Sequence, residues 1–322
     1  MSQLPFRRNF LQHALAVSAW MQEHDVRGGI DPRTLGMEIA LGDRAVRFYP
    51  QFSVERDGQV GFVPRLGTGA SGFVGWLPRP GRGWLESGDK LAFKSFARRH
   101  GLRTPLSGGP GTLPACDYLV KKADSTLGRH LHGPFPASRR AEIPQGHFWE
   151  QFVRGQVVKA WYWNGELAVV ERLTMPAVIG DGHSSLAELA LQALGPTAAS
   201  SPPPAELLAL QGTTLVSVPA AGQVVQLEYR YLSPFNPGND VDHDVRAAIA
   251  GTPLEDQLVR AGRACLQAVR EDAREDIAFS LDGVLDDQDR LWFLQVNCNP
   301  QLHPAFYAPM LNALFVPVAQ EA

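Results

Sequence analysis

The chain has 322 residues, of which 44% are hydrophobic and 20% charged, and its formal net charge is −3. This length suffices for one large domain or for two to three smaller domains, each with its own core. The near-neutral charge argues against nucleic acid or an anionic membrane as a partner. No apolar run approaches the roughly 20 residues that span a bilayer, and three scattered cysteines argue against a disulfide framework or a Cys-rich zinc site. We therefore expect a globular, cytoplasmic protein.

The first 88 residues predict a divergent N-terminal α/β domain. A helix is expected over residues 10–21, where apolar residues recur at helical spacing, and strands over 37–48 and 59–66. Asp57-Gly58 is typical of a hairpin turn. The glycine-rich run 67–72 fits neither the dinucleotide-binding pattern nor the P-loop pattern, so it predicts a tight turn or a mobile loop. No motif here identifies a substrate, and the domain is a candidate for substrate binding.

From Asp89 onward, helices and strands mix along the chain. Residues 89–100 predict a short helix closed by Gly101, and a capping box at Thr252 opens a helix to about Ala273. Strands are expected at 118–121, 148–153, 157–163, 167–172 and 224–231, with a final pair at about 278–285 and 291–296. Asn164-Gly165 predicts a tight hairpin between two of them.

Three oxygen-bearing side chains lie on the final pair of expected strands. Residues two apart on a strand point to the same face, so Gln295 and Asn297 project together, and a hairpin could bring Asp282 opposite them. Such a trio suits Mg²⁺, which accepts oxygen ligands and shares its site with phosphate oxygens. By itself the pattern is weak, because polar strand residues more often face solvent.

Three cations upstream strengthen the pattern. Lys90 opens a helix, Lys121 or its neighbour Lys122 ends a strand before a polar loop, and Arg230 lies on another expected strand. Each alone is typical of a solvated surface residue. Together with the acidic hairpin they could clamp a triphosphate.

In this order and spacing, the sequence resembles the ATP-grasp superfamily of carboxylate–amine ligases. Residues 89–94 resemble its first nucleotide-binding lysine motif, 119–129 the second lysine and flexible loop that close over ATP, and 150–155 the hinge whose backbone reads adenine. Residues 229–233 and 282–300 are similar to D-alanine–D-alanine ligases. Residues 172–189 are similar to the cyanophycin-synthetase and bifunctional glutathione-synthetase branch.

The resemblance implies an α+β ATP-grasp fold in which two subdomains, residues 89–155 and 156–322, clasp ATP behind the N-terminal domain of residues 1–88. It implies nucleotide-binding roles for Lys90, Lys121, Ser125, Gly128, Glu150, Phe152, Val153 and Arg230. It implies catalytic roles for Arg230, Arg172 and Lys121, and metal ligation by Asp282, Gln295 and Asn297. The implied cofactors are ATP and Mg²⁺, with two ions for which Mn²⁺ can substitute.

The implied reaction joins a small-molecule or peptide carboxylate to an amine through an acylphosphate, with release of ADP and phosphate. Two alternatives stay open, namely a kinase on the same fold and a catalytically weakened nucleotide-binding protein. A homodimer is common in the family. Neither a nucleic acid nor a membrane is expected as a partner.

Several positions depart from the family pattern. Gln295 replaces a glutamate, which removes one negative charge from the metal site. Val157 stands where many members place an acidic residue on the ribose. Ser280 replaces a substrate-binding arginine of the D-alanine–D-alanine ligases, and Gln301 replaces a glycine, so we do not expect D-alanyl-D-alanine synthesis.

Overall fold

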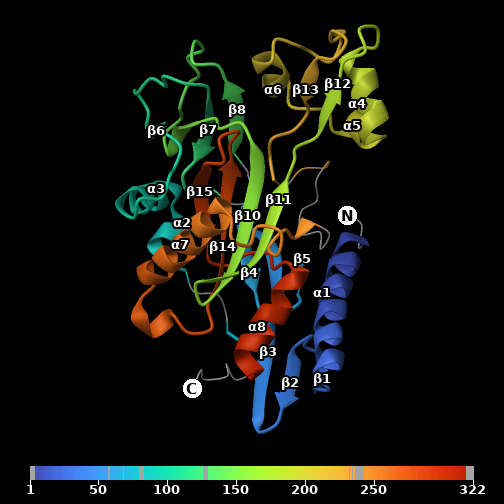
Figure 1. Ribbon diagram of the computed structural model, residues 1–322, viewed down its shortest axis with the longest axis vertical. Coiled ribbons are helices and arrows are strands. Elements are labelled where there is room, and N and C mark those ends of the chain that lie inside the picture. Colours follow the sequence, from blue (N-terminus) through green and yellow to red (C-terminus); the bar gives the residue numbers. More distant parts are fainter. Residues whose placement is uncertain are drawn as a thin grey trace.

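The computed structural model describes residues 4–56, 59–67, 69–79, 83–125, 130–231, 233, 235 and 243–316. In these ranges the chain forms a mixed α and β structure with a five-stranded sheet, two four-stranded sheets and a two-stranded sheet. Figure 1 shows the five-stranded sheet at the lower end of the molecule and the smaller lobes at the upper end. Among the described helices, none is long and apolar enough to cross a membrane.

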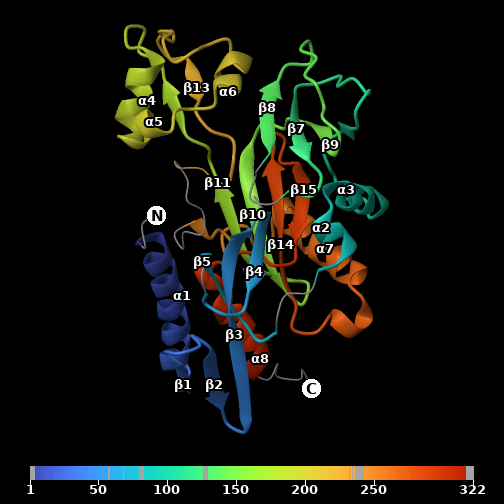
Figure 2. The same cartoon turned by 180° about the vertical axis from the view of Figure 1, so that it is seen from behind.

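The N-terminal part contains the expected helix, but a turn at Gly42-Asp43 divides the expected strand 37–48 into two antiparallel strands. Its elements are α1 (Leu4–Glu23), β1 (Arg27–Ile30), β2 (Met37–Leu41), β3 (Arg44–Arg56), β4 (Gln59–Val63) and β5 (Ala70–Leu77). Helix α1 lies beside the sheet in both views (Figures 1 and 2). The expectation of a turn or loop throughout 67–72 is wrong, because β5 already begins at Ala70 and pairs with Val54 of β3. The expected turn at Asp57-Gly58 falls outside the described residues.

The next segment builds a four-stranded sheet with the order β6–β9–β7–β8. Its elements are α2 (Leu85–Gly88), α3 (Lys90–Arg99), β6 (Ser107–Gly108), β7 (Tyr118–Lys122), β8 (Leu131–Phe135) and β9 (His147–Gln151). The Asp89 carboxylate caps α3 by accepting the N–H groups of Leu91 (2.7 Å) and Ala92 (3.1 Å). Gly101 ends the helix at φ +66°, a conformation that glycine adopts without steric cost. The helix at Lys90 is thus confirmed.

The central sheet is antiparallel and has the order β11–β10–β14–β15. Its strands are β10 (Gln156–Trp163), β11 (Glu166–Leu173), β14 (Ala278–Leu285) and β15 (Leu291–Asn297). The hairpin at Asn164-Gly165 is confirmed, with φ of 50° and 83°, as a two-residue turn of this twist requires. Helix α7 (Pro253–Ala268) contributes to the core on one face of this sheet. It ends five residues before the predicted Ala273, and Glu271–Ala273 forms a separate 3₁₀ helix, η2.

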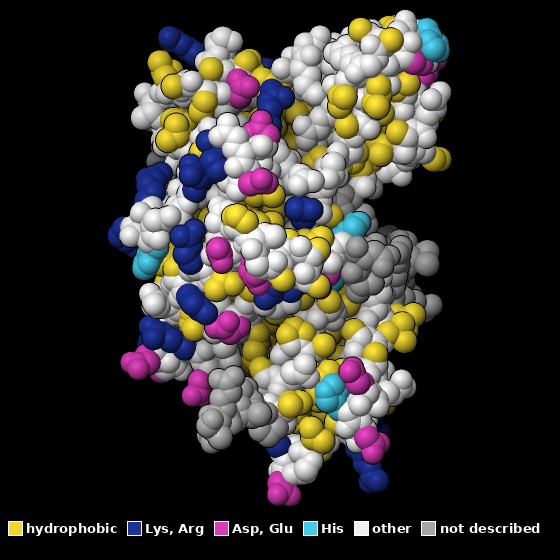
Figure 3. All heavy atoms as spheres, in the orientation of Figure 1, with side chains coloured by type: hydrophobic (Ala, Val, Ile, Leu, Met, Phe, Trp, Pro, Cys, Tyr) yellow, Lys and Arg dark blue, Asp and Glu magenta, His cyan; other side chains and the backbone are white. Residues whose placement is uncertain are grey.

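A small lobe follows β11. It comprises β12 (Ala177–Ile179), α4 (Leu186–Leu194), α5 (Thr197–Ser200), α6 (Ala205–Leu210) and β13 (Val224–Gln226). The expected strand 224–231 is therefore too long, and Arg230 lies beyond it. The physical reason is Glu228, whose carboxylate accepts the backbone N–H groups of Tyr229 (2.8 Å) and Arg230 (3.0 Å). In Figure 3, hydrophobic side chains gather on this lobe, where the paired residues Ile179 and Val224 are exposed.

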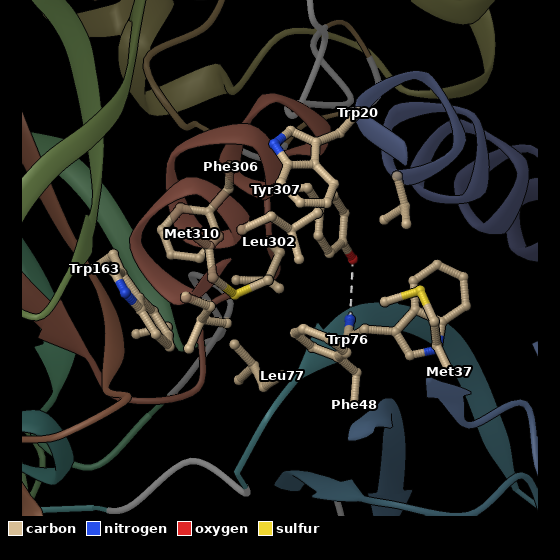
Figure 4. Packing of buried hydrophobic residues seen from close by; sticks show 14 of the residues in the cluster. Trp20, Met37, Phe48, Trp76, Leu77, Trp163, Leu302, Phe306, Tyr307 and Met310 are labelled. Atoms are coloured by element: carbon tan, nitrogen blue, oxygen red, sulfur yellow. Dashed lines mark hydrogen bonds between the residues drawn. The ribbon is translucent and has the colours of Figure 1, made fainter. Parts of the chain in front are cut away.

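One hydrophobic core joins the beginning of the chain to its end. It contains Trp76 of β5, Trp161 and Trp163 of β10, and buried residues of η3 (Pro304–Phe306) and α8 (Tyr307–Phe315) (Figure 4). The Trp76 backbone N–H donates to the Tyr307 hydroxyl at 3.0 Å. Residues 1–88 therefore share their core with the part that follows residue 155.

Candidate active site

A row of polar side chains crosses the central sheet at one level. The strand register places Glu171 of β11 opposite Lys159 of β10, Lys159 opposite Asp282 of β14, and Asp282 opposite Gln295 of β15. Side chains at paired positions project to the same face of a sheet. These four residues therefore form one continuous row, which we call the polar row.

Asp282 is the centre of this row. Its Oδ2 accepts hydrogen bonds from Gln295 Nε2 at 2.6 Å and from Asn297 Nδ2 at 3.1 Å. Its Oδ1 lies 2.9 Å from the Lys159 ammonium. Burial alone would raise the pKa of Asp282, but Lys159 and the two amide donors overcome this and lower it. The expected hairpin thus brings Asp282, Gln295 and Asn297 together around an ionised carboxylate.

Sequence reasoning missed Lys159. A single lysine between Val158 and Ala160, both buried, carries no motif. Strand alternation was the available signal, but it only places Lys159 on the same face as Trp161; the register between β10 and β14 puts it opposite Asp282.

A second charged group lies between the helix α3 and the sheet β6–β9–β7–β8. The Glu150 carboxylate is buried and contacts the ammonium groups of Lys121 and Lys94, the latter at 2.7 Å. Burial alone would raise the pKa of Glu150, but the two lysines lower it to about 2. The Glu150 side chain therefore holds Lys121 in place. Lys94, also missed, donates in addition to Thr104 Oγ1 and to the Pro105 carbonyl, both at 3.1 Å.

Lys90 connects this group to the polar row. Its ammonium donates to the backbone carbonyl of Ser125 and lies 3.3 Å from the Ser125 hydroxyl. Burial and the neighbouring Lys121 lower the pKa of Lys90 to about 8, against an opposite effect of Glu150 and of Asp282. The pKa of Lys90 on α3 thus responds to charges on β7, β9 and β14.

The predicted hinge lies at the end of β9. The Phe152 N–H donates to the Asp117 carbonyl at 2.7 Å, so it is engaged within the protein. The Phe152 ring packs edge to face on Tyr229, with centroids 5.5 Å apart. Next to Tyr229, Arg230 forms two hydrogen bonds to Glu228, at 2.9 and 2.7 Å. Arg230 therefore lies near the hinge, with its guanidinium held by a buried carboxylate.

Other predicted residues lie elsewhere. Arg172 is exposed and pairs with Val158 in the sheet, one step from the polar row. The structure therefore puts it on the opposite face from Asp282, because successive strand residues alternate. Lys122 pairs with the exposed Asp124 at 3.2 Å. This favours Lys121 over Lys122 as the lysine of the predicted site. Gly128 lies outside the described residues.

The donor set of the trio fits one divalent cation of the Mg²⁺ type. Asp282 supplies an ionised carboxylate, and the two amides carry oxygens that a half-turn of each amide group would present. Within the described ranges, no group of three or more His, Cys, Asp or Glu residues could hold a metal ion. The trio has a single acidic member, because Gln295 stands in place of a glutamate.

No protein-family model and no curated protein matches the sequence. A bifunctional glutathione synthetase from Pasteurella multocida is similar over 94% of this chain and 44% of that chain, with 15% identity and a TM-score of 0.44. A D-alanine–D-alanine ligase from Bacillus anthracis is similar over 71% of this chain and 65% of that chain, with 11% identity and a TM-score of 0.36. This chain thus covers less than two thirds of either protein. Many of the solved structures to which this chain is similar are ATP-grasp ligases.

Proposed function

We propose that this chain is an ATP-dependent carboxylate–amine ligase of the ATP-grasp type. The observation that carries the proposal is the convergence of the Gln295 and Asn297 amides on the Asp282 carboxylate, together with the ammonium groups of Lys90 and Lys121, which Ser125 and Glu150 hold in place. Two ammonium groups near an ionised carboxylate with amide neighbours suit a triphosphate together with a divalent cation. Each of these residues also falls at its position in the ATP-grasp sequence pattern.

The nucleotide would lie between the two four-stranded sheets. Lys90 and Lys121 would neutralise its phosphates, and Arg230 is a further candidate from the neighbouring segment. The Phe152 and Tyr229 rings offer an apolar wall for adenine, with Val153 as the hinge residue. Ser125, whose carbonyl already accepts from Lys90, is a candidate for helping to exclude water from the site.

In the proposed reaction, a substrate carboxylate oxygen attacks the γ-phosphorus of ATP and ADP leaves. The amine nitrogen of the second substrate then attacks the acyl carbon of the acylphosphate, phosphate leaves, and the amine gives up a proton. Carboxylate and phosphate are both anions, so positive charge around the transferred group is the main requirement. Bound Mg²⁺, held by Asp282, Gln295 and Asn297, would supply part of that charge.

The substrates would be a small-molecule or peptide carboxylate and an amine. Residues 1–88 are the candidate for selecting them, because their core continues into residues 302–315 directly after the predicted metal ligands. The placement of Arg172 on the opposite face disfavours a role for it in holding the carboxylate.

The test is phosphate release from ATP across a panel of carboxylates and amines, with the mass of the product determined. Loss of water between two substrates identifies a ligase, and addition of phosphate to one substrate identifies a kinase. Lys121→Met should lower the rate at least about 100-fold, whereas Lys122→Met is the matched control with a neighbouring lysine on the outer face. Equal loss in both variants, or no phosphate release with any pair, contradicts the proposal.

A second candidate is a nucleotide-binding protein of weak catalytic power, and Gln295 favours it because this residue removes one negative charge from the cluster. Gln295→Glu distinguishes the two. Activity that is absent in the natural chain and present in the variant supports the second candidate, while an active natural chain eliminates it.

A further inference from the structure

Lys159 is a fixed positive charge within the polar row. Its ammonium lies 2.9 Å from Asp282 Oδ1, and its side chain is 11% exposed. The same ammonium lies 4.8 Å from the centre of the Tyr231 ring and 5.5 Å from the centre of the Trp161 ring. Aromatic faces attract an ammonium group, so a carboxylate and two rings hold Lys159 from several sides.

The two oxygens of Asp282 serve different partners. Oδ1 contacts the Lys159 ammonium, whereas Oδ2 accepts from Gln295 and Asn297. If the Gln295 and Asn297 amides rotate so that their oxygens lie beside Asp282 Oδ2, these three oxygens can ligate one divalent ion while Lys159 stays in place. A second ion bridged by the same carboxylate would need Oδ1, which the ammonium occupies.

The charges of the side chains around Asp282 also indicate one divalent ion rather than two. Mg²⁺ is usually bound through one or two carboxylates together with phosphate oxygens. Here Asp282 contributes one negative charge, Gln295 and Asn297 contribute none, and Lys159 contributes one positive charge. These two charges cancel, which suffices for one ion that arrives with its nucleotide. The other carboxylate of the polar row, Glu171, lies beyond Lys159 on β11 and accepts from the Tyr231 hydroxyl, so no second carboxylate lies next to Asp282.

We propose that this chain binds one divalent ion with its nucleotide and that Lys159 supplies the positive charge of the second ion expected from the sequence resemblance. The inference rests on the proposed function, because it presupposes a nucleotide at the polar row. Lys159 would then be a positioning residue that fixes the orientation of Asp282 and adds charge beside the phosphates.

The test counts Mn²⁺ ions by electron paramagnetic resonance. The full chain is titrated with Mn²⁺ in the presence of equimolar AMP-PNP, a non-hydrolysable ATP analogue, and all bound Mn²⁺ is counted per chain; a sample without protein identifies the one ion that the nucleotide binds by itself, which is counted as the first ion. We expect one ion per natural chain and two ions in the double variant Lys159→Met, Gln295→Glu, which frees Oδ1 and restores the second carboxylate. Two ions in the natural chain, or one in the double variant, overturn the inference.

Two single variants test whether the positive charge of Lys159 weakens Mn²⁺ binding. Removal of the ammonium in Lys159→Met should tighten Mn²⁺ binding about tenfold or more, because a like charge a few ångströms from the ion is lost. Lys159→Arg keeps the charge and should bind Mn²⁺ as the natural chain does. Unchanged or weaker binding in Lys159→Met overturns the inference, and circular dichroism shows that each variant is folded.

AMP-PNP binding, measured by calorimetry, distinguishes failure of the proposed function from failure of the one-ion inference. A natural chain that does not bind the nucleotide defeats the proposed function and this inference with it. Normal nucleotide binding together with two Mn²⁺ ions defeats this inference alone.

Discussion

Replacement of Glu150 by glutamine should destabilise the fold strongly. The Glu150 carboxylate is 1% exposed and contacts two lysines, of which Lys94 is also 1% exposed. Glutamine cannot balance their charge, and removal of one partner from a buried ion pair costs about 3–5 kcal/mol. The pKa of Glu150 gives a similar figure, because a fall from 4.5 to about 2 corresponds to about 3 kcal/mol.

The sign of the pH dependence follows from the same shift. The folded-state pKa of Glu150 is depressed, so its contribution to stability is complete above pH 4.5 and is lost as the pH falls through about 2. The difference in unfolding free energy between the natural chain and Glu150→Gln should therefore shrink by about 2 kcal/mol between pH 7 and pH 3.

Urea unfolding, followed by tryptophan fluorescence, measures both effects. Lys121→Met is a suitable comparison, because Lys121 is 14% exposed and Glu150 retains Lys94 as a partner; it should cost less than Glu150→Gln. A loss below about 1 kcal/mol for Glu150→Gln at pH 7, or a difference that does not change with pH, would refute the role given to this ion pair.

Three further predictions concern the nucleotide, the metal and the N-terminal core. Lys90 is cationic below its lowered pKa of about 8, and only the cation attracts the phosphates of ADP. The Kd for ADP should therefore rise up to about tenfold per pH unit above pH 8. Calorimetry on Lys90→Met should give weaker binding of ADP that does not change with pH in this way. Asp282→Asn should lower Mn²⁺ affinity in the presence of AMP-PNP at least about tenfold, as measured by paramagnetic resonance, and an unchanged affinity would exclude Asp282 as a ligand. Tyr307→Phe removes the hydroxyl that accepts from the Trp76 backbone N–H and contacts His13 Nδ1, and it should lower the free energy of unfolding by about 1–3 kcal/mol; a near-neutral result in urea would contradict the idea that this hydroxyl joins the N-terminal part to α8.

The sequence by itself determined the local features of this protein. Asp89 and Gly101 mark the two ends of α3, and Asn164-Gly165 marks the hairpin between β10 and β11, because caps and tight turns depend on neighbouring residues. The approach of Asp282 to Gln295 and Asn297 followed from strand alternation and a short hairpin. All of these depend on interactions between residues close in the chain or on adjacent strands.

Only the tertiary structure decided which charges meet. Lys159 and Asp282 are 123 positions apart, and the register between β10 and β14 joins them. A one-residue step on β11 puts Glu171 on the face of the polar row and Arg172 on the other, and composition does not distinguish the two. Lys94 likewise became a buried partner of Glu150 through the tertiary contact between α3 and β9. Register and packing depend on all the strands and helices at once, so no single segment of sequence specifies them.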